Sequence, residues 1–155
     1  MLCRHKQVEE VHPMMELSEL REFIDKEFPQ SQIEIEAIGE KSSRLRLRVG
    51  TSHLRPGGTV SGPSMMLLGD CALYVAILSE IGRVALAVTT SFNINFLNKP
   101  SADKDLIAEC KLLKLGSRLV IGEVTIYSDG LEEPVAHAVG TYSIPPDAFS
   151  NRDEQ

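Results

Sequence analysis

The alternation of apolar and polar residues predicts one amphipathic helix, six strands and one long apolar segment. Near the N-terminus, "ELSELREFIDKEF" spaces Leu17, Leu20, Ile24 and Phe28 three or four residues apart, which is typical of a helix that ends before Pro29. "IEIEAI" and "SRLRLRV" alternate apolar with charged residues around the turn "GEKSS", so they predict a half-exposed antiparallel hairpin. Four more strands are predicted later, in "RVALAVTTSFNINFL", "DLIAECKLLKL", "RLVIGEVTIYS" and "PVAHAVGTYSI".

The long apolar segment lies between the two groups of strands and contains a single carboxylate, Asp70. It runs 14 residues, from 65 to 78, which is too short to cross the roughly 30 Å of a membrane's hydrocarbon core. It is also too long for one buried strand, and a carboxylate near its middle argues against a membrane. Both limits favour a helix.

Helix start and stop signals flank this segment. Pro63 is tolerated in a first turn, Ser61 or Ser64 can cap the N-terminus, and Gly82 is a stop signal, so we predict a helix from about Pro63 to Glu80. Its apolar residues point in nearly every direction, so the helix must be surrounded rather than laid on a surface. We therefore expect an α+β fold in which an antiparallel sheet wraps around one central helix.

The length of 155 residues is sufficient for one domain with its own core. We expect an N-terminal extension with the amphipathic helix over residues 1–30, the main domain over 31–145 and a flexible tail over 146–155. The N-terminal stretch lacks the apolar core of a signal peptide, so we expect a soluble protein that is not exported.

Composition excludes several classes of function. The net charge is −6, and the alternating arginines of "SRLRLRV" are typical of a solvated strand face, which argues against nucleic-acid binding. The three cysteines are odd in number and far apart, and no Cys/His spacing indicates a metal site. A reducing cytoplasm, with no membrane association and no metal, fits these observations.

Asp70 and the segment before it carry the candidate chemistry. A carboxylate in an apolar helix must either be neutralised or lie in a crevice that water reaches, although a structural Asp bonded to a strand or to Tyr74 is an equal alternative. In "HLRPGGTVSGP", glycines and prolines lead into the helix, and the Gly62 amide is among its unpaired N-terminal donors. Such a donor suits a developing oxyanion, while an ordinary glycine-rich turn is the alternative.

These stretches resemble a known family. "HLRPGGTVSGPSMMLLGD", "TTSFNINFLNKP", "KLGSRLVIGEVTIYSDG" and "AHAVGTYSI" are similar to the hotdog-fold acyl-CoA thioesterases of the phenylacetic-acid-degradation (PaaI) type, over roughly residues 33–145. In that family an Asp or Glu follows the first glycine of a His-Gly-Gly approach by eight residues, as Asp70 follows Gly62. The next strand ends in an Asn and Pro pattern, which Asn93 and Pro100 match.

The resemblance implies hydrolysis of an acyl-CoA thioester without a metal or other cofactor. Gly62 would polarise the carbonyl, and Asp70 would act as the nucleophile or as the base that activates water. Thr89 corresponds to a hydroxyl that assists in some relatives, although a polar residue on the outer face of a strand is an equal alternative. Two positions depart from the family pattern. Where the family usually has His-Gly-Gly, this chain has Ser61-Gly62-Pro63, and where the family usually has Asn, this chain has Arg55. Substrate preference and rate are therefore open.

The remaining candidates would contact the substrate. Arg55 would pair with a thioester oxygen or a phosphate, His53 would polarise a carbonyl, and the "LGS" turn lies where relatives contact CoA phosphates; each has a purely structural or solvated alternative. The substrate-binding candidates are Arg55, Ser61, His53, Asn93, Lys114, Ser117 and Arg118. Cys71, beside Asp70, and His137 are more typical of structural side chains.

Helix geometry predicts an assembly. Eight residues at about 1.5 Å each separate Gly62 from Asp70 by about 12 Å, too far for both to act on one carbonyl within one chain. A two-fold homodimer with antiparallel central helices would bring Asp70 of one copy to Gly62 of the other, and such dimers could pair further into tetramers. The alternatives to a thioesterase are a non-catalytic acyl-CoA binding protein and a hotdog hydratase or dehydratase.

Overall fold

The computed structural model describes residues 15–84 and 87–146. Cys3, residues 1–14 of the expected extension and residues 147–155 of the expected tail lie outside the described residues. The two helices are α1, Leu17–Glu27, and α2, Gly62–Ile81. The main sheet contains β1 (Ile33–Gly39), β2 (Ser42–Leu47), β5 (Val88–Phe96), β6 (Leu106–Leu115), β7 (Leu119–Ser128) and β8 (Pro134–Ser143).

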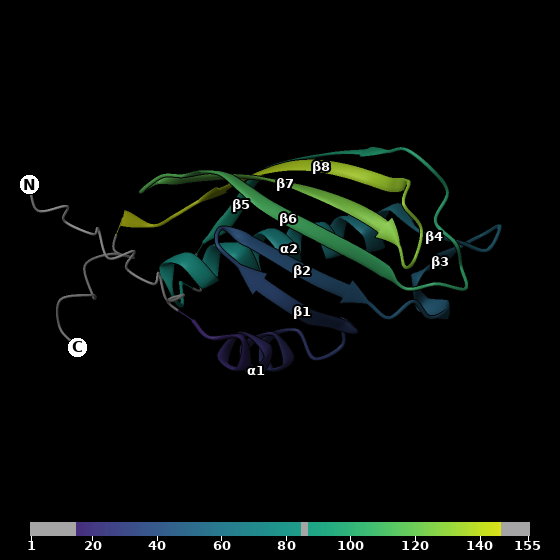
Figure 1. The fold of residues 1–155 in the computed structure, drawn as a ribbon, viewed down its shortest axis with the longest axis horizontal. Helices are drawn as coiled ribbons and strands as arrows, with labels where there is room; N and C mark the ends of the chain where they lie inside the picture. Colours follow the sequence, from purple (N-terminus) through teal and green to yellow (C-terminus); the bar gives the residue numbers. More distant parts are fainter. Residues whose placement is uncertain (1–14, 85–86, 147–155) are drawn as a thin grey trace, which may run out of the picture.

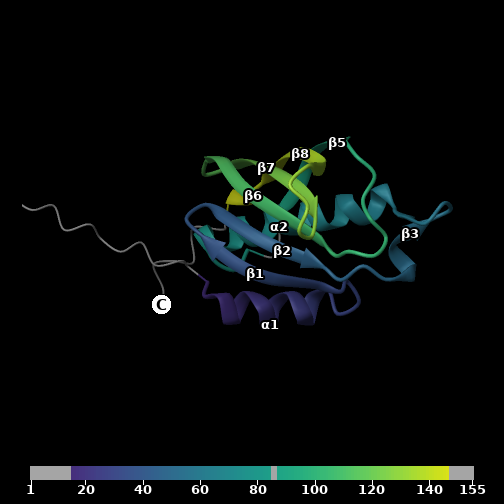
Figure 2. The same ribbon diagram turned by 45° about the vertical axis from the view of Figure 1, so that its right-hand side comes forward.

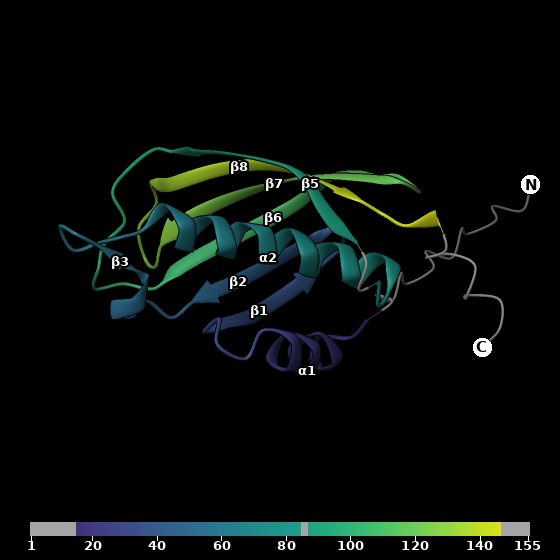
Figure 3. The ribbon, with the colours of Figure 1, turned by 180° about the vertical axis from the view of Figure 1, so that it is seen from behind.

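The main sheet curls around α2, which lies along its inner face (Figures 1 and 3). Its six strands follow the order β1-β2-β6-β7-β8-β5, and all neighbours are antiparallel. Helix α1 lies beside β1, at the edge of the fold (Figure 2). The predicted α+β architecture of a long central helix, a wrapped antiparallel sheet and an N-terminal amphipathic helix is confirmed.

The segment between β2 and α2 contains short elements that the hydrophobic pattern does not predict. These are a 3-10 turn, η1 (Thr51–His53), and two strands of two residues each, β3 (Leu54–Arg55) and β4 (Thr59–Val60). Two residues are too few for alternation to be visible in a sequence. The β3–β4 hairpin projects from the end of the fold where α2 begins (Figure 2).

Glycine shapes the turn of this hairpin. The Gly58 amide donates to the Arg55 carbonyl at 3.1 Å, and Pro56 occupies the first central position of the turn. Gly57 has φ of 100° and Gly58 of 76°, backbone conformations that residues with a Cβ rarely adopt. The glycine-rich approach is therefore a compact hairpin that leads the chain to the first turn of α2.

Helix α2 begins and ends at the predicted signals, one residue outside the predicted range at each end. Ser61 is the N-cap, and its hydroxyl accepts the Ser64 amide at 3.3 Å. Gly82 ends the helix with φ of 86°. By length and composition α2 could cross a membrane, but 67% of its apolar 18-residue window is buried inside the fold, as expected of a core helix.

Close contact between α2 and the sheet depends on two glycines. Gly122 of β7 and Gly140 of β8 are cross-strand partners, and the Leu73 side chain of α2 lies against both. A Cβ on Gly122 would lie 2.5 Å from Cδ2 of Leu73, and a Cβ on Gly140 would lie 2.4 Å from its Cδ1. Because Leu73 is confined on both sides, it cannot move away from one strand without approaching the other.

The two edges of the main sheet differ. At β1, the Arg21 side chain of α1 donates to the Ile35 carbonyl at 3.1 Å, so the helix covers this edge. At β5, none of the residues that the structure describes adds a further strand, and Val88 and Phe96 are 54% and 51% exposed. The β5 edge therefore offers unpaired backbone groups and apolar side chains.

The outer face of the sheet is a network of ion pairs. Arg44 and Arg46 of β2, and Arg48 just after it, each bond carboxylates on neighbouring strands and loops, as expected of a solvated strand face. Their partners are Glu34, Glu36, Asp105, Glu109 and Asp129. The arginines are thus neutralised locally and form no basic stripe for nucleic acid.

The glycine contact predicts a specific sensitivity to volume. We expect Gly140→Ala to lower the free energy of unfolding by about 1–3 kcal/mol, because the added methyl group overpacks the Leu73 contact. Urea denaturation at fixed protein concentration measures this. Gly50→Ala is the control, because Gly50 has φ of −133° and a Cβ there would meet no atom closer than 3.7 Å. Equal losses in the two variants would contradict the explanation.

Candidate active site

The N-terminus of α2 presents one available amide. After the N-cap Ser61, the first helical residue is Gly62, the second is Pro63, which has no N–H, and the amide of Ser64 donates to the cap. The Gly62 N–H makes no hydrogen bond within residues 15–84 and 87–146. It is therefore the free donor at the positive end of the helix dipole, suited to an anionic or carbonyl oxygen.

A pocket of about 530 Å³ adjoins Gly62, between the β3–β4 hairpin and the loop after β5. Arg55 and Lys99 contribute its cationic side chains, and Phe96 and Met65 contribute apolar surface. A Cβ on Gly62 would lie 3.2 Å from Cζ of Phe96, so a bare glycine backbone lets the ring approach. The pocket thus combines an amide donor, positive charge and an apolar wall, which suits an apolar group attached to an anionic one.

Asp70 lies two turns further along α2 and is half-buried. Its Oδ1 accepts hydrogen bonds from the Thr89 hydroxyl at 2.7 Å and from the Tyr142 hydroxyl at 2.7 Å. Oδ2 accepts none from the described part of the chain. Thr89 is exposed, so solvent reaches this contact. Of the structural alternatives considered from sequence, the bond to Tyr74 is not formed, and the partners come from β5 and β8.

A β-bulge turns Thr89 toward Asp70. Phe92 of β5 packs against the core, so strict alternation along the strand would direct Thr90 rather than Thr89 to the inner face. The register shifts between Thr89 and Ser91, and Thr89 pairs with Tyr142 across the two strands. The bulge therefore brings both hydroxyls to the face that meets α2.

Tyr142 is a contact residue that sequence reasoning did not single out. It is only 4% exposed, and its ring stacks on Tyr74 with centroids 6.0 Å apart. Burial, and then the negative charge of Asp70, raise the pKa of Tyr142. The one available signal is alternation along β8, which places Tyr142, two residues after Gly140, on the inner face of the sheet. Alternation does not indicate which residue of α2 it contacts.

His53, Ser61 and Asn93 occupy different surroundings. His53 accepts the Gly50 amide on Nδ1 at 2.9 Å, and its carbonyl accepts the Ser61 amide at 2.8 Å, so both groups shape the approach to α2. Asn93 pairs with Val139 and alternates with inward-facing Phe92, so it faces the outer side of the sheet. Within one chain, Asn93 and Asp70 are therefore on opposite faces of the sheet.

Lys114, Ser117 and Arg118 lie in or beside the β6–β7 hairpin turn and are exposed. Figure 3 shows this turn at the end of the sheet near the C-terminus of α2, opposite the β3–β4 hairpin. One chain therefore separates these three residues from the pocket beside Gly62.

Cysteine and metal chemistry receive no support from the described residues. Burial, and then the nearby Asp70 charge, raise the pKa of Cys71 to about 12, so its thiolate is scarce near neutral pH. Burial also raises the pKa of Cys110 to about 12. Within residues 15–84 and 87–146, no group of three or more His, Cys, Asp or Glu side chains could hold a metal ion.

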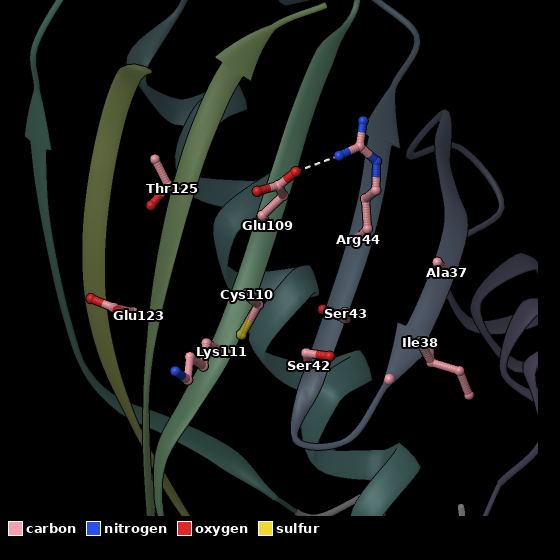
Figure 4. A pocket seen from close by; sticks show the side chains of 11 residues that line it. Ala37, Ile38, Ser42, Ser43, Arg44, Glu109, Cys110, Lys111, Glu123 and Thr125 are labelled. Atoms are coloured by element: carbon pink, nitrogen blue, oxygen red, sulfur yellow. Dashed lines mark hydrogen bonds and ion pairs between the residues drawn. The ribbon is translucent and has the colours of Figure 1, made fainter. Parts of the chain in front are cut away.

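Another pocket, of about 430 Å³, lies across the outer face of β1, β2, β6 and β7 (Figure 4). Its charged side chains, Arg44, Glu109, Lys111 and Glu123, are of mixed sign, and Arg44 bonds Glu109. None of the residues that line this pocket belongs to α2 or lines the pocket beside Gly62. Gly62 and Asp70 both belong to α2, on the inner side of the sheet.

Comparison with known proteins identifies the family. The model of the thioesterase superfamily matches residues 57–135, which is 79 of 155 residues. The crystal structure of a candidate thioesterase from Silicibacter sp. is 43% identical, with a TM-score of 0.81 over 87% of this chain and 95% of that chain. The comparison with curated proteins found no significant match.

More distant structures share the fold. Thioesterase superfamily member 2 of zebrafish is 19% identical, with a TM-score of 0.77 over 84% of this chain and 99% of that chain. A mutant of the phenylacetic acid degradation protein PaaI from Thermus thermophilus is 21% identical, with a TM-score of 0.67 over 80% of this chain and 99% of that chain. The resemblance found in the sequence is confirmed: this chain belongs to the thioesterase superfamily and is a thioester hydrolase with the hotdog fold.

Proposed function

We propose that this thioesterase hydrolyses an acyl-CoA, or a related thioester, at a site shared between two copies of the chain. The Gly62 amide of one copy polarises the thioester carbonyl, and Asp70 of the other copy acts as nucleophile or as the base that activates water. The observation that carries the proposal is the pairing, on one helix, of an N-terminal amide and a carboxylate oxygen to which none of the described residues makes a hydrogen bond.

Distance along α2 supports a shared site. Gly62 and Asp70 are eight residues apart in one helix, which corresponds to about 12 Å. An Asp side chain cannot span that length to a carbonyl held at the Gly62 amide of its own chain. Two antiparallel α2 helices related by a two-fold axis would place Asp70 of each copy beside Gly62 of the other and produce two equal sites.

The exposed apolar residues support the same arrangement. Met66 lies midway between Gly62 and Asp70, where the two-fold axis would pass, and Met66 and Leu67 are 41% and 45% exposed. β5 runs beside α2, because Phe96 lies against Gly62 and the Thr89 hydroxyl bonds Asp70, so its uncovered edge would allow two sheets to pair edge to edge. A homodimer would bury this surface, and it would also remove the open strand edge.

Positive charge supports an anionic substrate such as CoA. Arg55 and Lys99 line the pocket beside Gly62, where phosphate oxygens would be attracted. In the antiparallel dimer, the β3–β4 hairpin of one copy points toward the end of the other copy that carries Lys114, Ser117 and Arg118. We infer that the CoA moiety extends between these two groups of residues.

The departures from the family affect the rate more than the chemistry. Ser61 replaces the usual His but caps α2, and Pro63 removes one amide while leaving the Gly62 donor free. One such donor is typically worth about 10²–10³ in rate. The missing His is also the reason to retain a second candidate, a non-catalytic acyl-CoA binding protein. A hydratase is less favoured, because Nδ1 of His53 is bonded to the Gly50 amide.

Asp70→Asn tests the reaction. On a panel of acyl-CoA substrates, we expect the wild type to release free CoA and the variant to lose at least about 10²-fold in kcat, because Asn can neither attack nor accept the proton. Release of thiol measures turnover, and size-exclusion chromatography with light scattering verifies that the dimer persists. Asp25→Asn, on the exposed face of α1, is the matched control and should retain full activity.

Two outcomes would redirect the proposal. Thermal stabilisation by acyl-CoA without product would indicate the binding protein instead. Hydration of crotonyl-CoA without thioester cleavage would indicate a hydratase.

Mixing two inactive variants tests the shared site. Gly62→Pro removes the amide donor at a helical position that accepts proline, and the Phe96 ring, 3.2 Å from a Cβ at Gly62, must shift to admit it. A heterodimer of Gly62→Pro with Asp70→Asn would retain one intact site, so a statistical mixture should regain about a quarter of wild-type activity. Differently tagged copies, purified in sequence, isolate the heterodimer. Inactive heterodimers would contradict a site built from two chains.

A further inference from the structure

One oxygen of the Asp70 carboxylate accepts two hydrogen bonds. The hydroxyl groups of Thr89 and Tyr142 both donate to Oδ1, each at 2.7 Å. The Tyr142 hydroxyl also lies 3.2 Å from the Asp70 carbonyl oxygen, so it contacts both the main chain and the side chain of one residue. No residue in the described part of the chain donates to Oδ2, which leaves the carboxylate fixed at one oxygen and open at the other.

Of these two donors, Tyr142 is the more firmly placed. Its strand is paired on both sides, with Val120 of β7 and Thr89 of β5 opposite Tyr142 itself. Its ring is 4% exposed and stacks on Tyr74, at an interplanar angle of 18°. Thr89 is exposed and belongs to the edge strand. The rigid end of the contact is therefore the buried tyrosine.

Its surroundings favour the protonated, donating form of the Tyr142 hydroxyl. Burial and the Asp70 charge raise the pKa of Tyr142 above its ordinary value of 10.0. A raised tyrosine pKa preserves the neutral, protonated form as pH increases, so the hydroxyl continues to donate to the carboxylate. The same preference makes proton transfer from Tyr142 to a substrate unfavourable, which leaves orientation of Asp70 as its contribution.

We propose that Tyr142 is a positioning residue of the thioesterase site, holding Oδ1 of Asp70 so that Oδ2 faces the thioester. This inference depends on the function proposed for Asp70. Attack on the carbonyl and removal of a proton from water both need one carboxylate oxygen directed out of the helix. A carboxylate that rotates freely would be aligned for a smaller fraction of the time.

Tyr142→Phe tests the proposal, because it keeps the stacked ring and removes the hydroxyl. We expect kcat to fall about tenfold to a hundredfold, the rate equivalent of one hydrogen bond to a charged group, with KM within about twofold of wild type. A loss of packing around the bound substrate would change KM as well.

Tyr74→Phe is the matched control. It makes the same change in the neighbouring ring, whose hydroxyl bonds none of the residues that the structure describes, and we expect wild-type kcat and KM. Unchanged kcat in Tyr142→Phe would overturn the proposal. So would an equal loss in both variants, because it would indicate a general effect on packing.

Crystal structures of wild type and Tyr142→Phe separate this proposal from the proposed function. We expect the Asp70 carboxylate to adopt one orientation in the wild type and to turn, or occupy several orientations, in the variant. If the wild type hydrolyses no thioester, the proposed function fails and the carboxylate orientations still test the positioning. An Asp70 carboxylate in the same position in both structures would overturn it.

Discussion

The close approach of α2 to the sheet is the constraint on which the rest of this structure depends. A helix that is apolar on nearly every side must be surrounded, and burial of its side chains supplies much of the free energy that drives folding. The sheet can curl this tightly because Gly122 and Gly140 carry no side chain where Leu73 meets them. The shape of the main sheet therefore depends on two missing side chains as much as on the apolar ones.

The wrapping is incomplete on one side of α2, and the candidate chemistry is found there. Met66 and Leu67 are exposed on α2, and Asp70 meets only the last two strands of the sheet. A carboxylate can occupy this helix because hydroxyl groups of Thr89 and Tyr142 replace the water that it has lost. A fully enclosed carboxylate would gain the same bonds but could not reach a substrate.

The two edges of the main sheet differ in how far the described chain covers them. Helix α1 covers β1, and its Arg21 side chain donates a hydrogen bond to the Ile35 carbonyl of that strand. The β5 edge has no such cover in the described chain, and β5 runs beside α2, where Phe96 lies against Gly62 and the Thr89 hydroxyl bonds Asp70. In the proposed dimer, the exposed apolar part of α2 and the unpaired β5 edge would both be covered by the second copy. The same contact would form the site that holds the thioester.

The sequence by itself determined the elements and the residues with chemical potential. Apolar periodicity, capping residues and glycine stops act over a few neighbouring positions, so α2 was predicted to within one residue at each end. The same local signals indicated Gly62 and Asp70, because the first amides of a helix have no partner within it and a carboxylate is unusual in the middle of an apolar helix.

Only the tertiary structure decided which groups meet Asp70. The bulge at Thr90 sets which hydroxyl of β5 faces inward, and the pairing of β5 with β8 places Tyr142 beside it. The β3–β4 hairpin and the pocket at Gly62 likewise depend on contacts between separate segments. Strand register depends on partners dozens of residues away, and a local pattern contains no information about a partner that it does not touch.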